Sequence, residues 1–205
     1  MRTLFTIATF SQLIPVVIGV INFRFIDKNL KVFLFYLFVA VIVGLTSLLL
    51  VYFKKENIWV LHIFTIVEFL ILSLMYRIWI DDKRFKNVIS VFILIFSIGI
   101  ILIKSFVEQS NKIDNVSLTF ESILILVITS MYFIDYSLKN TIIDYFDYKF
   151  VITITLMFYF GGNIFVFALS NEINTWPIHV FIGIICQLIY GFVFLWQRFQ
   201  VKPSG

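Results

Sequence analysis

Residues 57–77 read NIWVLHIFTIVEFLILSLMYR, and this stretch decides the fold. A helix rises 1.5 Å per residue, so an apolar run of about 20 residues is long enough to cross the roughly 30 Å hydrocarbon core of a bilayer. The run nevertheless contains His62 and Glu68. An ionisable side chain inside a membrane span is unfavourable and marks a candidate functional site.

The composition of the whole chain agrees with a membrane protein. Of its 205 residues, 61% are hydrophobic and only 14% are charged, whereas soluble domains average about 45–50% apolar and about 25% charged residues. The mean hydropathy is +1.02. The only cysteine is Cys186, which excludes an intrachain disulfide.

Seven segments have the length and composition of a membrane-spanning helix. They are Leu4–Phe23, Val32–Phe53, Trp59–Trp79, Val88–Phe106, Leu118–Tyr136, Phe150–Ser170 and Trp176–Trp196. None alternates apolar and polar residues with period two, as strands of a membrane barrel do. The first segment lacks a signal-peptide cleavage site and is interpreted as a retained helix. We therefore expect an all-α integral membrane protein, with residues 1–205 forming one bundle of seven transmembrane helices.

The distribution of basic residues predicts the orientation of the bundle. The loops after the first, third and fifth segments, together with the C-terminus, carry eleven Lys or Arg residues, and the other side carries five. The positive-inside rule then places the N-terminus outside and the C-terminus in the cytoplasm of a multi-pass protein of the bacterial inner membrane. Because the basic residues lie in these loops, the net charge of +4 does not indicate nucleic-acid binding.

Polar residues inside the predicted spans lie from mid-membrane outward. His62 lies in the outer half of its span and Glu68 near the middle. Glu121 lies about one turn inside the membrane. This pattern predicts an outward-facing polar pocket, lined by Gln12, His62, Glu68, Glu121, Asn163, His179 and Gln187. The alternative is that these groups hydrogen-bond between helices and only stabilise packing, by about 1 kcal/mol each.

Two enzymatic alternatives start from the same residues. His62, Glu68 and His179 include the ligand types of a catalytic zinc site, but His62 and Glu68 are about 240° apart around one helix and do not share a face. A serine hydrolase is disfavoured because none of Ser73, Ser122 and Ser170 lies in a nucleophile-elbow context. We therefore expect neither a metal nor another cofactor, and the sequence favours a protein that is not an enzyme.

Several other features have structural interpretations. Trp59, Trp79, Trp176 and Trp196 lie at predicted span ends, as in an aromatic belt. Gly161 and Gly162 are expected to let two helices approach closely. Residues 81–84 are interpreted as a solvated turn. The cluster at 144–148, Asp-Tyr-Phe-Asp-Tyr, is a candidate docking site for a cytoplasmic partner or simply an interfacial loop.

Short stretches spread over most of the chain form a further pattern: Asn57, Trp59, His62, Glu68, Phe69, Glu121, Ser122, residues 159–163 (YFGGN), Phe167, Leu169, Ser170, Asn171, His179 and Tyr190. In these residues the chain resembles a family of small seven-helix membrane proteins common in Bacteroidetes. The chain departs from the family pattern at residues 149–152 (KFVI) and at Gln187, where an Asn is more usual. The resemblance implies a seven-helix bundle and assigns no activity.

The leading functional hypothesis is a sensory or regulatory membrane protein. It would bind a small molecule or a lipid in the polar pocket and signal to a cytoplasmic protein partner. The alternatives are a membrane-embedded, metal-dependent lipid hydrolase, and a membrane effector or pore of a defence system, such as a CRISPR accessory protein. Membrane lipid is an expected partner in each case, and the sequence leaves a homo-oligomer open.

Overall fold

A computed structural model describes residues 2–106, 115–140, 142, 144–169 and 175–200. All regular structure in these residues is helical: α1 Arg2–Ser11, α2 Leu13–Ile21, α3 Lys28–Tyr52, α4 Ile58–Trp79, α5 Lys83–Phe106, α6 Asn115–Lys139, α7 Tyr148–Leu169 and α8 Trp176–Gln200. Four residues used in the sequence analysis lie outside the described residues: Lys112, Ser170, Asn171 and Lys202. The side chains of Arg2, Lys104, Phe167 and Trp176 are also not described.

Six helices, α3 to α8, are long and apolar enough to cross a membrane. The all-helical membrane class is therefore confirmed. These helices extend past several predicted span limits because polar residues continue the first and last turns. In α3, for example, the helix begins at Lys28 rather than at Val32, and the Asp27 side chain accepts a hydrogen bond from the Leu30 amide at 2.7 Å.

The first predicted span differs from the other six, because it consists of two short helices. The helix is interrupted at Gln12, and the apolar part of the pair, Thr6–Ile21, is shorter than the other spans. Pro15 explains the interruption: it has no N–H to donate to the carbonyl four residues earlier, at Ser11. Gln12 itself keeps α-helical backbone angles, φ −65° and ψ −23°, so α1 and α2 follow one another along the span predicted over Leu4–Phe23.

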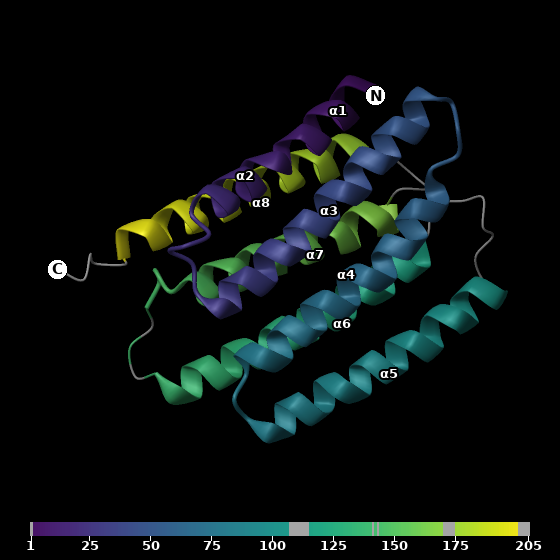
Figure 1. Cartoon of the computed structure of the whole chain (residues 1–205). Coiled ribbons are helices and arrows are strands. Elements are labelled where there is room, and N and C mark those ends of the chain that lie inside the picture. Colours follow the sequence, from purple (N-terminus) through teal and green to yellow (C-terminus); the bar gives the residue numbers. More distant parts are fainter. Residues whose placement is uncertain (1, 107–114, 141, 143, 170–174, 201–205) are drawn as a thin grey trace.

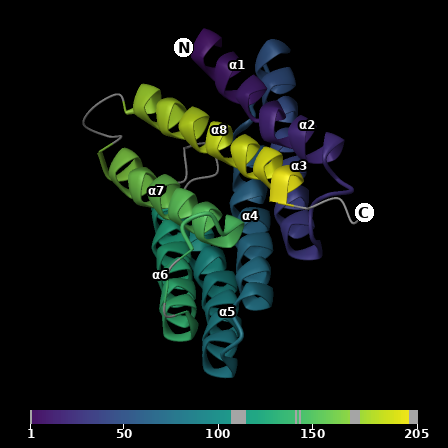
Figure 2. The ribbon, with the colours of Figure 1, turned by 90° about the vertical axis from the view of Figure 1, so that its left-hand side faces the viewer.

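The helices form a closed ring with one helix outside it. Successive neighbours in the ring are the α1–α2 pair, α3, α4, α6, α7 and α8, and α8 packs back against α1 and α2. The fifth helix, α5, packs on the outside against α4 and α6, and lies at the far edge of the molecule from α8 (Figures 1 and 2). The two termini lie at opposite ends of the bundle (Figure 1).

Polar groups lie inside this ring and large apolar side chains lie outside. Glu68, Glu121 and Asn163 are each at most 5% exposed, whereas Phe38, Ile98 and other large apolar residues are about half exposed. Aromatic contacts fill the rest of the interior, including Phe33 against Tyr190 with ring centroids 4.9 Å apart. An apolar exterior is stable only in lipid, and polar groups inside a membrane protein face the bundle interior.

Candidate functional site

Glu68 is held by a tyrosine from the neighbouring helix. It lies in the middle of α4, and its Oε1 accepts a hydrogen bond from the hydroxyl of Tyr36 on α3 at 2.5 Å. Both side chains are buried. A short hydrogen bond to a carboxyl group stabilises it in the absence of water, so Tyr36 satisfies one of the two oxygens of Glu68.

Glu121 lies on α6, across the interior from α3. Its side chain is 1% exposed, and its Oε1 is buried with no hydrogen-bond partner. It interacts electrostatically with Glu68, since α4 and α6 pack together. Although Glu121 lies only about one turn inside the predicted span, it is buried, because α6 turns this face toward the ring interior.

The third part of the site joins α7 and α8. The Oδ1 of Asn163 and the Nδ1 of His179 are 2.9 Å apart in a hydrogen bond. Tyr159, one turn earlier on α7, lies beside this pair, with its ring centroid 6.0 Å from that of His179. Tyr159 in turn interacts electrostatically with Glu68 and Glu121. The carboxyl pair and the Asn163–His179 pair therefore belong to one interior polar network: Tyr36, Glu68, Glu121, Tyr159, Asn163 and His179.

The structure therefore links four of the seven predicted pocket residues: Glu68, Glu121, Asn163 and His179. The other three lie elsewhere or at the edge of the interior. His62 is half-buried on α4. Gln12 lies where the α1–α2 pair contacts α3. Its Oε1 would be 2.6 Å from a Cβ atom added to Gly44. The Oε1 of Gln187 is buried on α8 without a hydrogen-bond partner.

The predicted zinc ligands do not come together. Within the described part of the chain, no group of three or more His, Cys, Asp or Glu side chains could hold a metal ion, so His62, Glu68 and His179 do not form such a group. His62 and Glu68 are six positions apart on α4 and therefore lie on different faces of that helix. The chemistry of the network is accordingly that of carboxyl, phenol, amide and imidazole groups.

Sequence reasoning missed Tyr36 and the role of Tyr159. Both lie in predicted spans, where a tyrosine resembles any other large aromatic residue. A hydroxyl in mid-membrane is the signal that could have found them, because a buried tyrosine hydroxyl usually has a hydrogen-bond partner. Only the tertiary structure shows that the Tyr36 hydroxyl bonds to Glu68 and that the Tyr159 ring lies beside His179.

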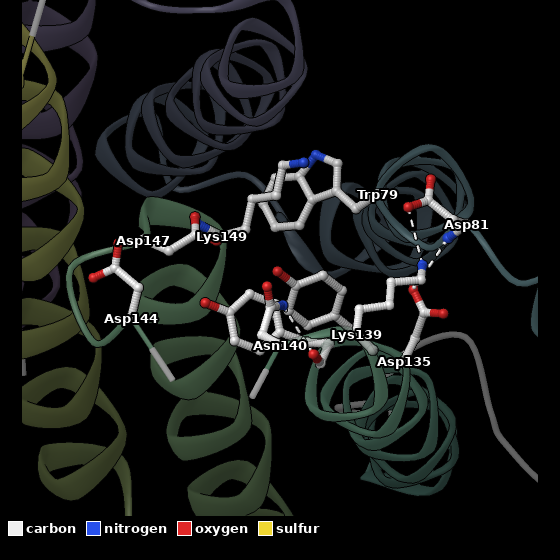
Figure 3. Close-up of a pocket in the computed structure, with 10 residues that line it drawn as sticks. Trp79, Asp81, Asp135, Lys139, Asn140, Asp144, Asp147 and Lys149 are labelled. Carbon is white, nitrogen blue, oxygen red and sulfur yellow. Dashed lines mark hydrogen bonds and ion pairs between the residues drawn. The ribbon is translucent and has the colours of Figure 1, made fainter. Parts of the chain in front are cut away.

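A cavity of about 400 Å³ lies at the end of the bundle where α4, α6 and α8 end and α7 begins, and Figure 3 shows its lining. We call it the C-terminal-end cavity. Its lining consists of Trp79, Asp81, Tyr132, Asp135, Tyr136, Lys139, Asn140, Asp144, Asp147 and Lys149. These residues come from the last turns of α4 and α6, the loops that follow them, and the start of α7.

One wall of the C-terminal-end cavity is held together by Lys139. Its Nζ lies 2.9 Å from the Oδ2 of Asp81 and 2.8 Å from the Oδ2 of Asp135, and Figure 3 shows it between the two. The backbone amide of Asp81 also donates to the same oxygen of Asp135, at 3.1 Å. The hydrogen bond from Lys139, with its charge, lowers the pKa of Asp81. Asp81 thus joins α4 to α6, and residues 81–84 are all exposed, in agreement with the predicted solvated turn.

Asp147 lines the cavity on the side opposite Lys139, and Trp79 also belongs to the lining. Burial raises the pKa of Asp147, although its carboxylate accepts a hydrogen bond from the Lys149 amide at 2.9 Å. Trp79 is 4% exposed and packs against Tyr76, Tyr132 and Tyr148. Trp79 lies at a span end as predicted, but its side chain faces the interior, whereas that of Trp59 is 52% exposed.

Comparisons with protein-family models, with curated proteins and with solved structures found no match. The resemblance to the Bacteroidetes family stays a prediction, and the function is argued below from the residues of this chain.

Proposed function

We propose that this chain is a sensory or regulatory protein of the bacterial inner membrane, whose interior polar network binds a small hydrogen-bond-donating molecule. Glu121 is the observation that carries the proposal. One of its carboxyl oxygens is buried without a donor, beside a second buried carboxyl group. A buried polar group without a partner is unfavourable by about 1–3 kcal/mol, and more if it is charged.

A ligand with an ammonium group or with several hydroxyl groups would offset this penalty. It would donate to the unpaired oxygen of Glu121, and an ammonium group would also reduce the repulsion between Glu121 and Glu68. The phenol of Tyr159 and the imidazole of His179 supply further polar contacts on the α7–α8 side of the network. Five helices of the ring, α3, α4, α6, α7 and α8, contribute to this network or contact it directly, so binding would alter how they pack.

A second protein on the cytoplasmic side would respond to ligand binding. The connections there are short, three residues between α4 and α5 for example. A partner that contacts these loops would respond to a shift of the ring helices. The charge distribution places the loops that follow α2, α4 and α6 in the cytoplasm, and residues 144–148 among them are the candidate docking site.

The proposal is tested by thermal unfolding of the purified protein in detergent, with a panel of small amines and polyols. A ligand present at 100 times its Kd adds about 2.7 kcal/mol of stability, which raises the Tm of a chain of this size by roughly 5–10 °C. We expect at least one compound to do so for the wild type but not for Glu121→Gln. The control is Glu56→Gln, which changes an exposed loop residue.

The unliganded proteins provide the second measurement. We expect Glu121→Gln to be at least as stable as the wild type, since the amide removes a buried acidic group that lacks a donor. If Glu121→Gln is clearly less stable and no compound in the panel shifts the wild type, the network serves packing alone and the proposed function is wrong.

A further inference from the structure

The C-terminal-end cavity lies where the helices leave the hydrocarbon core. Trp79 and Lys139 are the last residues of two candidate spans, Trp59–Trp79 and Val116–Lys139, and Lys149 is one residue inside the start of a third. Side chains at span ends lie at the level of the lipid headgroups. A pocket in this position is open to a headgroup from the bilayer as well as to solutes from the adjoining water.

The charges that line the cavity are unevenly paired. Lys139 is occupied by Asp81 and Asp135 on one wall. Asp144 and Asp147, on the other side in Figure 3, each accept a backbone amide, from Phe146 and Lys149 respectively. No ion pair is formed by either of them within the described residues. These two carboxylates therefore provide a site for a cation.

The aromatic side chains of the cavity favour the same ligand. Trp79, Tyr132 and Tyr136 all line it, and aromatic rings attract ammonium groups. The cavity adds a second requirement, because its lining also includes Lys149. The ammonium of Lys149 favours a ligand that carries a negatively charged acceptor oxygen as well as its own ammonium group.

We propose that the C-terminal-end cavity binds a primary ammonium joined by a short linker to a phosphate, the chemistry of an ethanolamine phospholipid headgroup. The ammonium would pair with Asp144 and Asp147. The phosphate would accept hydrogen bonds from Lys149. A volume of about 400 Å³ lies within the range of ordinary small-ligand pockets, roughly 300–1,000 Å³. This site is separate from the interior polar network and does not depend on its function.

The test measures the affinity of the full-length protein in detergent for three probes. They are a short-chain phosphatidylethanolamine, a short-chain phosphatidylglycerol and free phosphoethanolamine, each titrated while the Tm is recorded. We expect phosphatidylethanolamine to raise the Tm and phosphatidylglycerol, which lacks the ammonium, to have a much smaller effect. An equal response to free phosphoethanolamine supports the same chemistry with a soluble ligand; no response to it identifies the lipid as the source.

Two variants remove a cavity carboxylate and keep the local fold. Asp144→Asn and Asp147→Asn each retain the oxygen that accepts the backbone amide, and we expect each to weaken phosphatidylethanolamine binding roughly tenfold or more. The matched control is Asp82→Asn: Asp82 lies at the same end of the bundle and accepts the Arg84 amide at 2.6 Å, but it does not line the cavity. Equal responses to the two lipids, or unchanged binding in both cavity variants, would overturn the proposal.

Discussion

At the residue scale, the network depends on which polar atoms have partners and which do not. Tyr36 and Glu68 satisfy each other across α3 and α4, whereas the Oε1 of Glu121 and the Oε1 of Gln187 are buried without hydrogen bonds. The first pair stabilises the bundle, and the unpaired oxygens destabilise it. Substitutions of Tyr36 and Glu121 should therefore change the stability in opposite directions.

Tyr36→Phe removes the one hydrogen bond that the structure shows for the Glu68 carboxyl group. A hydrogen bond to a charged group contributes about 1.5–3 kcal/mol, and its loss leaves a buried acceptor unpaired. We expect the free energy of unfolding in detergent to fall by about that amount. Tyr52→Phe, at a residue 80% exposed, is the control. Equal stability of the two variants would show that the Tyr36–Glu68 bond does not stabilise the protein.

Lys139→Gln tests the wall of the C-terminal-end cavity through its pH dependence. The folded-state pKa of Asp81 is lower than its unfolded value, so its contribution to stability is present above pH 4, roughly, and is lost as the pH falls through the folded-state pKa. Because the Asp81 side chain is 77% exposed, screening by solvent limits the contribution to about 1 kcal/mol at most.

We therefore expect Lys139→Gln to be slightly less stable than the wild type at pH 7, with a difference that shrinks toward pH 3. Chemical unfolding in detergent at both pH values measures it. Lys83→Gln, an exposed basic residue at the same end of the bundle, should show no such convergence. A difference that stays constant from pH 7 to pH 3 would contradict the assignment to the Asp81 carboxylate.

At the scale of the elements, two helices differ from the rest. The first span is interrupted at Gln12, and α5 lies outside the ring, held by contacts such as the stacked rings of Phe69 and Phe96, with centroids 4.0 Å apart. Pro15 indicates the first feature in the sequence, whereas nothing in the sequence distinguishes α5 from the other spans. The difference arises from Pro15 in one case and from the neighbours of the helix in the other.

The two adjacent glycines of α7 make a matched pair. A Cβ on Gly162 would lie 2.7 Å from the Cδ1 of Ile182 on α8, whereas a Cβ on Gly161 would meet nothing within 4 Å. We expect Gly162→Val to lower the free energy of unfolding by about 1–3 kcal/mol, because overpacking forces neighbours to move. Gly161→Val should be nearly neutral. Thermal unfolding measures the stability of the two variants. An equal loss of stability in both would show that the close approach of α7 and α8 does not explain the effect of Gly162→Val.

At the scale of the whole molecule, the ring surrounds the polar network with apolar surface. The closed order of contacts, from the α1–α2 pair through α3, α4, α6, α7 and α8, gives every ring helix an inner face. The helix outside it, α5, has large apolar side chains exposed along its length, such as Leu94, Ile98 and Ile101. This arrangement places the ionisable residues where lipid does not contact them.

The orientation of the bundle is tested by chemical labelling of single cysteines. In a Cys186→Ala background, which removes the buried native thiol, Glu56→Cys and Asp82→Cys introduce exposed residues at opposite ends. A membrane-impermeant maleimide should label Glu56→Cys in spheroplasts, and Asp82→Cys only after lysis. The reverse pattern would place the C-terminus outside and the Asn163–His179 end of the network toward the cytoplasm.

The sequence by itself determined the class of protein and the approximate position of each helix. Apolar segments of about 20 residues have one stable form in lipid, because a helix satisfies its own backbone hydrogen bonds. The positions of Glu68 and Asn163 within apolar segments are likewise enough to predict that both face the interior of the bundle, because lipid does not solvate polar side chains. Both predictions use only the residues of one segment at a time.

Only the tertiary structure decided which side chains meet. The Tyr36–Glu68 bond spans 32 positions in the chain, and Lys139 reaches Asp81 across 58. Such pairs depend on the rotation of each helix about its axis and on the order of helices around the ring. Both are set by the packing of many side chains at once. The unpaired oxygen of Glu121 and the C-terminal-end cavity follow from that packing, and no single segment of the sequence contains them.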